Sequence, residues 1–299
     1  MNNLPFDQPG RFYRGNLHTH STRSDGALGP AQVIAAYRDH GYDFLAITDH
    51  FLENYGFPIT DTREFRTPTF TTLLGAELHA PRIEIGQRWH IVSVGLPLDF
   101  APTGATETGP ELARRAAATG AFVGIAHPAW YGLTLADALS LDAAHAVEIF
   151  NQTCYTDNDR GDSWYMEEML LARGNRLMAY AADDAHFKER LDYRAAWVQV
   201  RAESLDPDAL LAAIKGGRFY ASQGPEIHHV AIDGDRLRVS CSPASSVFVS
   251  GRGPGARHET RDSLTECQFP LGPFAGSYCR VTVIDAAGKR AWTNPIWLS

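Results

Sequence analysis

Histidine and aspartate side chains near the amino terminus are spaced so that they can bind a metal ion. His18 and His20 stand two residues apart, and Asp25 follows them in the motif HxHxxxxDG. Side chains at positions i and i+2 of a strand point to the same face, so the two imidazoles can converge on one ion. Histidine is also the commonest metal ligand. His50 ends the next apolar run, and the four residues together predict the beginning of a metal site.

Further nitrogen and oxygen donors stand at the ends of later apolar runs. Glu77 follows the run that ends at Ala76, His127 follows residues 121–126, and His90 precedes residues 91–95. Asp184 and His186 follow residues 178–182, again two residues apart. The complete set is His18, His20, Asp25, His50, Glu77, His90, His127, Asp184 and His186. These ligands contain no sulfur, a composition that suits Zn, Mn or Fe without choosing among them.

The elements that position these residues alternate between strands and helices up to about residue 222. Strands are expected at 13–18, 42–48, 71–76, 91–95, 121–126, 146–150, 178–182 and 195–200. Helices are expected at 31–40, 111–119, 135–139, 164–173 and 206–216. This alternation predicts an α/β fold with a mainly parallel sheet, and about seven repeats favour a barrel, where active sites lie at the strand ends.

The pattern changes after Gly224-Pro225. Short alternating runs follow at 228–232, 237–241, 246–250, 266–270 and 278–284, with turn signals between or after them. These runs predict a small antiparallel, sandwich-like β domain. We therefore expect a barrel over residues 1–224 and an all-β domain over residues 225–299.

Composition excludes several classes of function. The chain of 299 residues has a net charge of −8, which argues against a nucleic-acid groove. No apolar run approaches the roughly 18 residues that span a membrane. The polar amino terminus lacks the apolar core of a signal peptide, and the four cysteines are scattered. We therefore expect a cytoplasmic protein with reduced cysteines and with neither a nucleic-acid nor a membrane partner.

The ordered motifs resemble a known family. HxHxxxxDG, then TDH, GxE, an isolated histidine before a strand, HP and DxH are similar to the PHP (polymerase and histidinol phosphatase) family of metal-dependent phosphoesterases. The resemblance covers roughly residues 12–222. Residues 217–225 and the β segment after them look like the CehA/McbA-like branch. The resemblance implies a distorted, TIM-like (β/α)7 barrel that holds two or three divalent transition metals.

The same resemblance implies how the donors divide among the ions. One ion would be held by His18, His20, Glu77 and Asp184, a second by Glu77, His90 and His127 with Glu77 bridging, and a third by Asp25, His50 and His186. Many relatives carry histidine where this chain has Asp25, so the third site is where the chain departs from the family pattern.

The chemistry that follows is hydrolysis of a small phosphorylated substrate by metal-activated water. Asp49 is expected to support a ligand histidine, and Arg160 to bind phosphate bidentately. Trp130 and Tyr131 are expected to wall the pocket, and Lys188 to reach the substrate.

Other residues near the expected ligands are weaker candidates. Glu148 and Asn151, at one strand end, could support the ligands. His79 shares a face with Glu77, although the family pattern does not ask for histidine there.

Two alternatives come from other classes of function. The CehA-like resemblance allows a hydrolase of carboxylic or carbamate esters or amides. Many amidohydrolases bridge their metals with a lysine, but the first lysine here is Lys188, so Glu77 would have to bridge. The second alternative is a non-catalytic metal- or carbohydrate-binding protein, in which tail aromatics stack on sugar: Phe274, Tyr278, Trp292 and Trp297.

Overall fold

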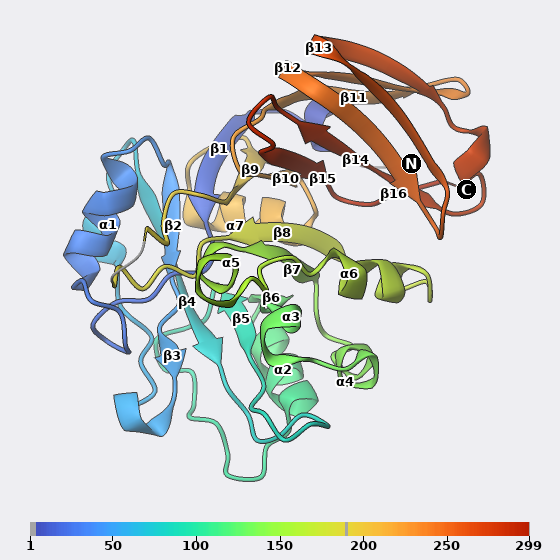
Figure 1. Cartoon of the computed structure of the whole chain (residues 1–299). Helices are drawn as coiled ribbons and strands as arrows, with labels where there is room; N and C mark the ends of the chain where they lie inside the picture. Colours follow the sequence, from blue (N-terminus) through green and yellow to red (C-terminus); the bar gives the residue numbers. More distant parts are fainter. Residues whose placement is uncertain (1–3, 189–190, 299) are drawn as a thin grey trace.

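A curved sheet surrounded by helices carries the first two thirds of the chain. The computed structural model describes residues 4–188 and 191–298, and its fold is a mixed α/β fold (Figure 1). Seven neighbouring strands form the curve: β1 (Arg11–Asn16), β2 (Phe44–Ile47), β4 (Thr71–Leu78), β5 (Ile91–Val94), β6 (Phe122–Ile125), β7 (Ala146–Asn151) and β8 (Met178–Ala182). The two-residue strand β3 (His50–Phe51) pairs with β4.

The direction of the strands departs from the expected parallel series at two places. β1, β2 and β4 pair in parallel, as do β6, β7 and β8, but β5 is antiparallel to both of its neighbours. The strand expected at 195–200 is β9 (Trp197–Ala202), and it lies antiparallel on the outer edge of β1. The α/β class is therefore confirmed, with a mixed rather than parallel sheet.

The expected closed barrel is not formed, because no ladder joins β8 to β1 within residues 4–188 and 191–298. Strand-like pairing between the two ends is an isolated bridge of Thr19 with Ala185, just beyond the strands. The His20 amide donates to the Ala185 carbonyl (2.9 Å), and the Asp184 amide donates to the His18 carbonyl (2.9 Å). The two ends of the sheet thus meet where the expected metal ligands lie.

Helices cover the outside of the sheet: α1 (Pro30–Arg38), α2 (Gly109–Ala118), α3 (Pro128–Tyr131), α4 (Leu135–Ser140), α5 (Gln152–Asn158), α6 (Trp164–Leu171) and α7 (Pro207–Lys215). α1 and α2 carry proline in the first turn, where no amide hydrogen is needed. At α2 the Thr108 hydroxyl accepts from the Glu111 amide, while the Glu111 carboxylate accepts from the Thr108 amide. These caps begin the helix close to its expected position.

Alternation along β2 shows why the sheet is buried on both faces. Phe44 and Ala46 pack inside the curve, whereas Leu45 and Ile47 pack against α1. Successive residues of a strand point to opposite faces, so a strand covered on both sides must be apolar throughout. All four residues of β2 are buried accordingly.

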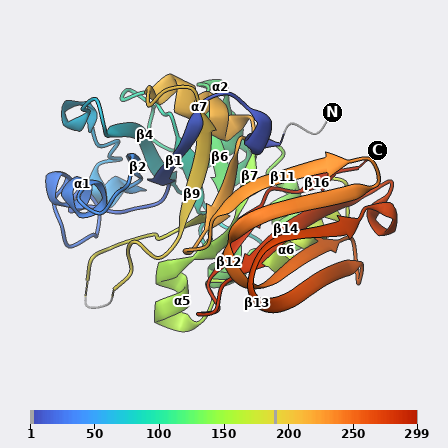
Figure 2. The same cartoon turned by 90° about the horizontal axis from the view of Figure 1, so that it is seen from above.

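The carboxy-terminal strands extend the same sheet. β10 (Phe219–Ser222) pairs with β9 on one side and β15 (Arg290–Thr293) on the other; the path continues through β14 (Tyr278–Ile284) and β12 (Arg236–Gly251) to β11 (Ile227–Asp233). β13 (Ala256–Pro270) pairs with β12, and β16 (Ile296–Trp297) with β14. Figure 2 shows these strands beside α6.

Two expectations for this region need correction. The runs at 237–241 and 246–250 belong to one long strand, β12, whose pairing with β13 shifts register between Ser240 and Ser246. Two separately bonded sheets of a sandwich are not found in the described part of the chain, because every pair joins the one path. The division at residue 224 stays a prediction.

Several aromatic side chains of this region are buried, Phe274 in its own core and Trp292 against Phe150 and Trp164. Phe274, Tyr278 and Trp292 are buried, so they offer no stacking surface for sugar. All four cysteines are buried and unpaired. None of the helices in the described ranges combines the length and apolar character that a membrane crossing requires.

Candidate metal centre

The ends of the strands bring all nine expected ligands to one place. His18 and His20 follow β1, His50 begins β3, Glu77 lies in β4 and His90 precedes β5. The remaining members come from three further segments: Asp25 from the loop after β1, His127 from the end of β6, and Asp184 and His186 from the end of β8. Their donor atoms form overlapping groups within 4.8 Å of one another: His20/Asp25/His50/His186, His18/His127/Asp184, His18/His20/Glu77 and Glu77/His90/His127.

Glu77 stands at the centre of the cluster and is fully buried. Its Oε1 lies 2.7 Å from His90 Nδ1 and 3.1 Å from His127 Nε2. Its Oε2 faces the other side, 2.5 Å from His50 Nδ1 and 3.8 Å from His20 Nε2. A carboxylate whose two oxygens face different histidines has the geometry that a bridge between two ions requires, and the bridging role that the family resemblance implies stays a prediction.

Asp184 joins the first two histidines from the opposite side. Its Oδ1 lies 2.8 Å from His20 Nε2 and 3.2 Å from His18 Nε2. The backbone φ is 55° at Asp184 and 21° at His127, in the left-handed region that non-glycine residues rarely adopt. Such strain persists where surrounding structure enforces it, commonly at functional sites.

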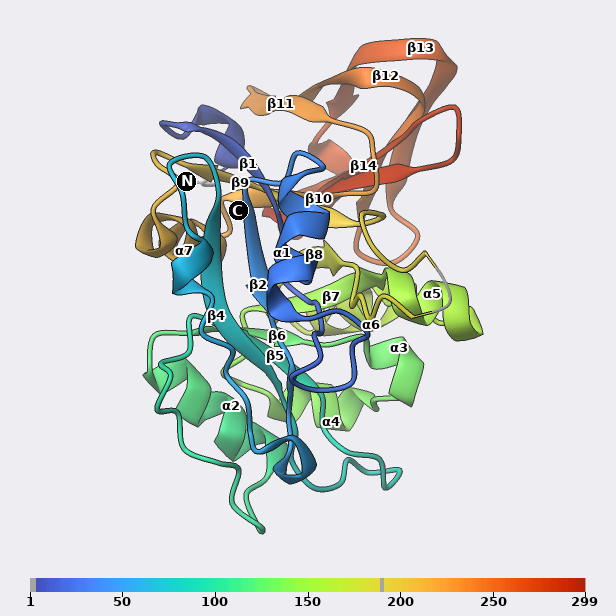
Figure 3. The ribbon, with the colours of Figure 1, turned by 90° about the vertical axis from the view of Figure 1, so that its left-hand side faces the viewer.

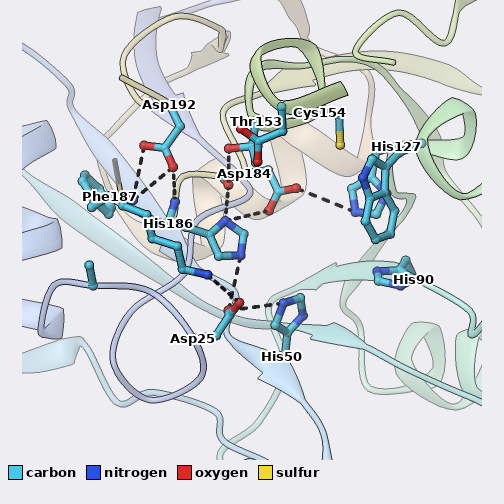
Figure 4. A pocket seen from close by; sticks show the side chains of 14 residues that line it. Asp25, His50, His90, His127, Thr153, Cys154, Asp184, His186, Phe187 and Asp192 are labelled. Atoms are coloured by element: carbon cyan, nitrogen blue, oxygen red, sulfur yellow. Dashed lines mark hydrogen bonds and ion pairs between the residues drawn. The ribbon is translucent and has the colours of Figure 1, made fainter. Parts of the chain in front are cut away.

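Asp25 lies on the open side of the cluster, as Figure 4 shows. Its Oδ1 is 3.3 Å from His186 Nε2 and 3.4 Å from His50 Nε2. The ammonium of Lys188 lies 3.0 Å from Oδ2. The third expected site is thus assembled, with a cation already beside its carboxylate.

Buried polar atoms that lack a well-aligned hydrogen bond, and whose near neighbours are other members of the cluster, test whether these residues fit a metal. They are His18 Nε2, His20 Nε2, Asp25 Oδ1, Glu77 Oε2, His127 Nδ1 and Asp184 Oδ1. An unsatisfied buried polar atom costs about 1–3 kcal/mol, so such atoms rarely gather without a reason. Five of the six belong to the atom groups or close contacts described above. A cation among them would satisfy both the carboxylates and the imidazole lone pairs, and the residues therefore fit divalent metal ions.

The carboxylates and histidines of the cluster shift one another's pKa values. Burial by itself raises the pKa of Asp184, but the His18 charge and the His20 hydrogen bond outweigh it and hold this pKa well below its usual range. Burial lowers the pKa of His186, but the hydrogen bond with Asp25 and the Asp184 charge raise it to about 9. Burial dominates at His90 and lowers its pKa to about 3. The carboxylates are therefore ionised and ready for cations.

Glu148 and Asn151, on β7, form hydrogen bonds with three of the expected ligands: His18, His127 and Asp184. Glu148 Oε1 lies 3.0 Å from His18 Nδ1, and Oε2 accepts from the His127 amide (2.8 Å). Asn151 Nδ2 donates to Glu148 (3.0 Å) and to Asp184 Oδ2 (3.1 Å). With the Nδ1 proton held by Glu148, His18 presents Nε2 to the cluster, which is how ligand histidines are commonly oriented.

Asp49 acts on a loop rather than directly on a ligand histidine. Its carboxylate accepts from the Ser21 amide and hydroxyl (2.7 and 2.8 Å), the Ser24 hydroxyl (2.9 Å) and the Thr60 hydroxyl (2.7 Å). Ser24 Oγ in turn lies 3.5 Å from His20 Nδ1. Asp49 thereby fixes the loop that carries Asp25.

His79 is the residue whose role the sequence did not reveal. It is buried; its Nδ1 lies 3.0 Å from the Trp89 carbonyl oxygen and its Nε2 lies 2.9 Å from His50 Nδ1. The only signal in the sequence is its position two residues after Glu77 on one strand face.

A cavity of about 940 Å³ opens onto the cluster (Figure 4). Trp130 and Lys188, both expected to contact substrate, line it. Tyr131 is buried behind it, with its ring 5.1 Å from that of His90. Arg160 is absent from the described lining, and its Nη1 donates to the Trp130 carbonyl (3.3 Å).

Comparison with known proteins supports the fold. No protein-family model and no curated protein sequence matches the chain. Among solved structures, a two-domain protein from Bacteroides vulgatus containing a predicted PHP-like metal-dependent phosphoesterase aligns over 95% of both chains, with TM-score 0.52 and 16% identity. The chain has that protein's fold.

Two further structures align over smaller parts of this chain. A candidate metal-dependent phosphoesterase from Bifidobacterium adolescentis covers 67% of this chain and 95% of its own, with TM-score 0.46 and 14% identity. An amidohydrolase from Chromobacterium violaceum covers 57% and 87%, with TM-score 0.41 and 16% identity.

Proposed function

We propose that this chain is a PHP-family hydrolase that cleaves a small phosphate ester by metal-activated water. The observation that carries the proposal is the group of buried donor atoms that face one another without a well-aligned hydrogen bond, beside a cavity of about 940 Å³. Such a cavity is large enough for a small substrate. The shared fold of the Bacteroides vulgatus protein agrees with this assignment.

The proposed ligand sets are those that the family resemblance implies: His18, His20, Glu77 and Asp184 for one ion; Glu77, His90 and His127 for a second; Asp25, His50 and His186 for a third. The donor groups of the structure overlap these sets and also bring His127 together with His18 and Asp184. Zn, Mn or Fe ions held there would activate water and offset the charge that develops on phosphoryl oxygens. Three ions, rather than two, are part of the proposal because the Asp25 group is assembled.

Side chains around the cavity would bind and orient the substrate. Lys188 lines the opening, so its ammonium can contact a phosphoryl oxygen that arrives beside Asp25. The Trp130 ring stands edge-on to the His90 and His127 rings, with centroids 5.3 and 5.2 Å away, and supplies an apolar wall for the organic group. Arg160 would act by holding the Trp130 backbone.

Metal removal and a bridging-residue variant test this proposal together. Chelation of the full chain should abolish hydrolysis of p-nitrophenyl phosphate or its diester, and Zn²⁺, Mn²⁺ or Fe²⁺ should restore it. Glu77→Gln should lower kcat/KM by more than about 100-fold and reduce the bound metal, because it removes a charge shared between ions. Glu266→Gln, on the remote strand β13, is the matched control. Metal-replete protein that cleaves no phosphate ester in a broad panel would contradict the proposal.

A second candidate is a hydrolase of carbamate or carboxylic esters or amides. Lys188 is the one lysine or arginine in the described lining of the cavity, and it is already paired with Asp25. Asp157 and Asp192 also line it, so a neutral ester would meet less repulsion there than a phosphate dianion. Aryl carbamate and aryl phosphate should be compared directly; faster cleavage of the carbamate would favour this candidate and the CehA/McbA-like branch.

The proposed function also includes a cellular location, a class of partner and a division into domains. It places the enzyme in the cytoplasm, with a small molecule as partner and neither nucleic acid nor membrane. It assigns catalysis to residues 1–224, whose curved sheet carries the cluster, and treats the β segment over residues 225–299 as a second domain.

A further inference from the structure

A second cavity, of about 750 Å³, lies on the other side of His79. It is formed by the segment that follows His50, by residues 79–88 between β4 and β5, and by residues 103–104. In Figures 1 and 3 these segments lie away from β12 and β13. The two cavities have no lining residue in common within the described ranges, so the second one is a separate space.

The second cavity is lined by two arginines and one carboxylate, Glu53, so its lining carries a net positive charge. Arg82 and Arg88 line it, are exposed, and form no hydrogen bond or ion pair with any residue in 4–188 or 191–298. Some exposed arginines elsewhere, such as Arg63 and Arg114, are bonded to neighbouring carboxylates, whereas Arg82 and Arg88 stand unpaired together in one cavity. Unpaired guanidinium groups in a chain of net charge −8 are available for an anionic group, which they bind in bidentate fashion.

The backbone of Arg82 and the hydroxyl of Thr103 also indicate that this cavity binds a ligand. Arg82 has φ of 29°, a left-handed conformation that is uncommon for a residue with a side chain. Thr103 also lines the cavity, and its Oγ1 is buried with no hydrogen-bond partner in the described structure. Strained residues and unsatisfied polar atoms are both enriched where a protein holds a ligand.

Apolar side chains define the remaining surface. Phe51, Phe57, Ala80 and Pro81 line the cavity beside the arginines. Pockets of this composition bind molecules whose apolar body is buried while a few polar groups fix the orientation. The arginine charges and the apolar side chains together complement a small organic anion.

We propose that this cavity binds a small organic anion, whose carboxylate or phosphate contacts Arg82 and Arg88 and whose apolar body packs against Phe57 and Pro81. The anion is either a separate ligand or the far end of a substrate held at the cluster; the absence of shared lining favours the separate ligand. The site does not depend on the proposed hydrolysis, because none of the nine expected ligands lines it.

Binding is tested with phenylphosphonate on the full, metal-stripped chain by amide NMR. Shifts are expected at residues 79–88 and 103–104. The double variant Arg82→Gln/Arg88→Gln should weaken binding by about ten-fold or more, since it removes two charge-assisted contacts. Benzyl alcohol, which has a similar apolar body without the charge, should bind at least about ten-fold more weakly. Arg252→Gln, on the distant turn between β12 and β13, should bind as the unaltered chain does.

Shifts confined to the cavity of Trp130 and Lys188, or equal affinity in the double variant, would overturn the proposal. Both substituted arginines are exposed, so the variant should fold, and an unchanged melting temperature verifies this. If the loaded enzyme is active, a raised KM only for substrates with a second anionic group identifies the substrate's far end. An unchanged KM, with phenylphosphonate binding retained in the unaltered chain, identifies a separate ligand. If the loaded protein shows no hydrolysis, the proposed function fails, but the NMR measurement of phenylphosphonate binding still decides whether this cavity binds an anion.

Discussion

The orientation of His50 depends on a histidine that is outside the expected ligand set. The Trp89 carbonyl can only accept, so Nδ1 of His79 donates to it and Nε2 of His79 is left as an acceptor. The His50 Nδ1 proton then lies between two acceptors, Oε2 of Glu77 at 2.5 Å and Nε2 of His79 at 2.9 Å. His50 then presents Nε2 toward Asp25. This is the kind of outer contact that fixes the ring of a ligand histidine.

We therefore expect His79→Leu to weaken binding of the ion nearest Asp25 by about 10–100-fold, the usual effect of losing such a contact. His79→Gln, which can still accept from His50, should recover part of the affinity. Metal titration calorimetry measures both, and ¹⁵N shifts of the His50 ring report the position of its proton. His145→Gln, away from the cluster, is the control. Full affinity in the leucine variant would mean that His79 has no positioning role.

At the scale of elements, strand ends were more predictable than strand partners. An i, i+2 pair such as His18 and His20 reveals its shared face from local geometry alone, and the apolar runs located most strands within a few residues. Pairing is decided by distant segments. Nothing in the sequence of β5 shows that it runs antiparallel to β4, and the bend that joins two expected runs into β12 arises from its partners. The hydrogen bonds of Asp49 with Thr60 and of His79 with the Trp89 carbonyl could not be predicted from the sequence for the same reason.

The loop between β1 and α1 provides a test at this scale. Asp49→Ala removes the acceptor for two serines and Thr60, and it should lower the free energy of unfolding by about 1–3 kcal/mol. Because the freed loop carries Asp25, bound metal should also fall. Urea unfolding and metal analysis measure the two effects. Asp61→Ala, whose carboxylate bonds only an exposed arginine in the described structure, should leave both nearly unchanged. A stable Asp49→Ala variant with full metal content would contradict the assigned role.

At the scale of the whole molecule, α6 and β14 meet through an unusual pair of neighbouring carboxylates. Glu168 accepts from the Tyr278 hydroxyl (2.6 Å) and from Arg280 Nε (2.9 Å), and Arg280 lies over the Trp164 ring. Glu167 is fully buried, and neither of its oxygens has a hydrogen-bond partner among the described residues. Burial, together with the Glu168 charge, raises the pKa of Glu167 well above its ordinary value.

This raised pKa gives stability a definite pH dependence. The folded chain keeps the Glu167 proton while the unfolded chain releases it near its ordinary pKa, so stability from this group is complete below that value and is lost as pH rises. Glu167→Gln should match the unaltered chain at about pH 4 and exceed its free energy of unfolding by about 1–3 kcal/mol at about pH 8. Urea unfolding at both pH values measures this.

The neighbouring residue supplies the control. Glu168→Gln loses charge-assisted hydrogen bonds and should be less stable than the unaltered chain at about pH 8. Equal stability of Glu167→Gln and the unaltered chain at this pH would show that Glu167 ionises freely in the fold.

The pairing of β10 with β15 has a consequence for the order of synthesis. Phe219–Ser222 leaves the ribosome about 70 residues before Arg290–Thr293, its outer partner. During that interval the sheet that begins at the metal-binding strands ends in an open edge, which is a template for pairing with another chain. Residues 290–293 close this edge. The edge of β10 is therefore covered only after all nine expected ligands have been synthesised.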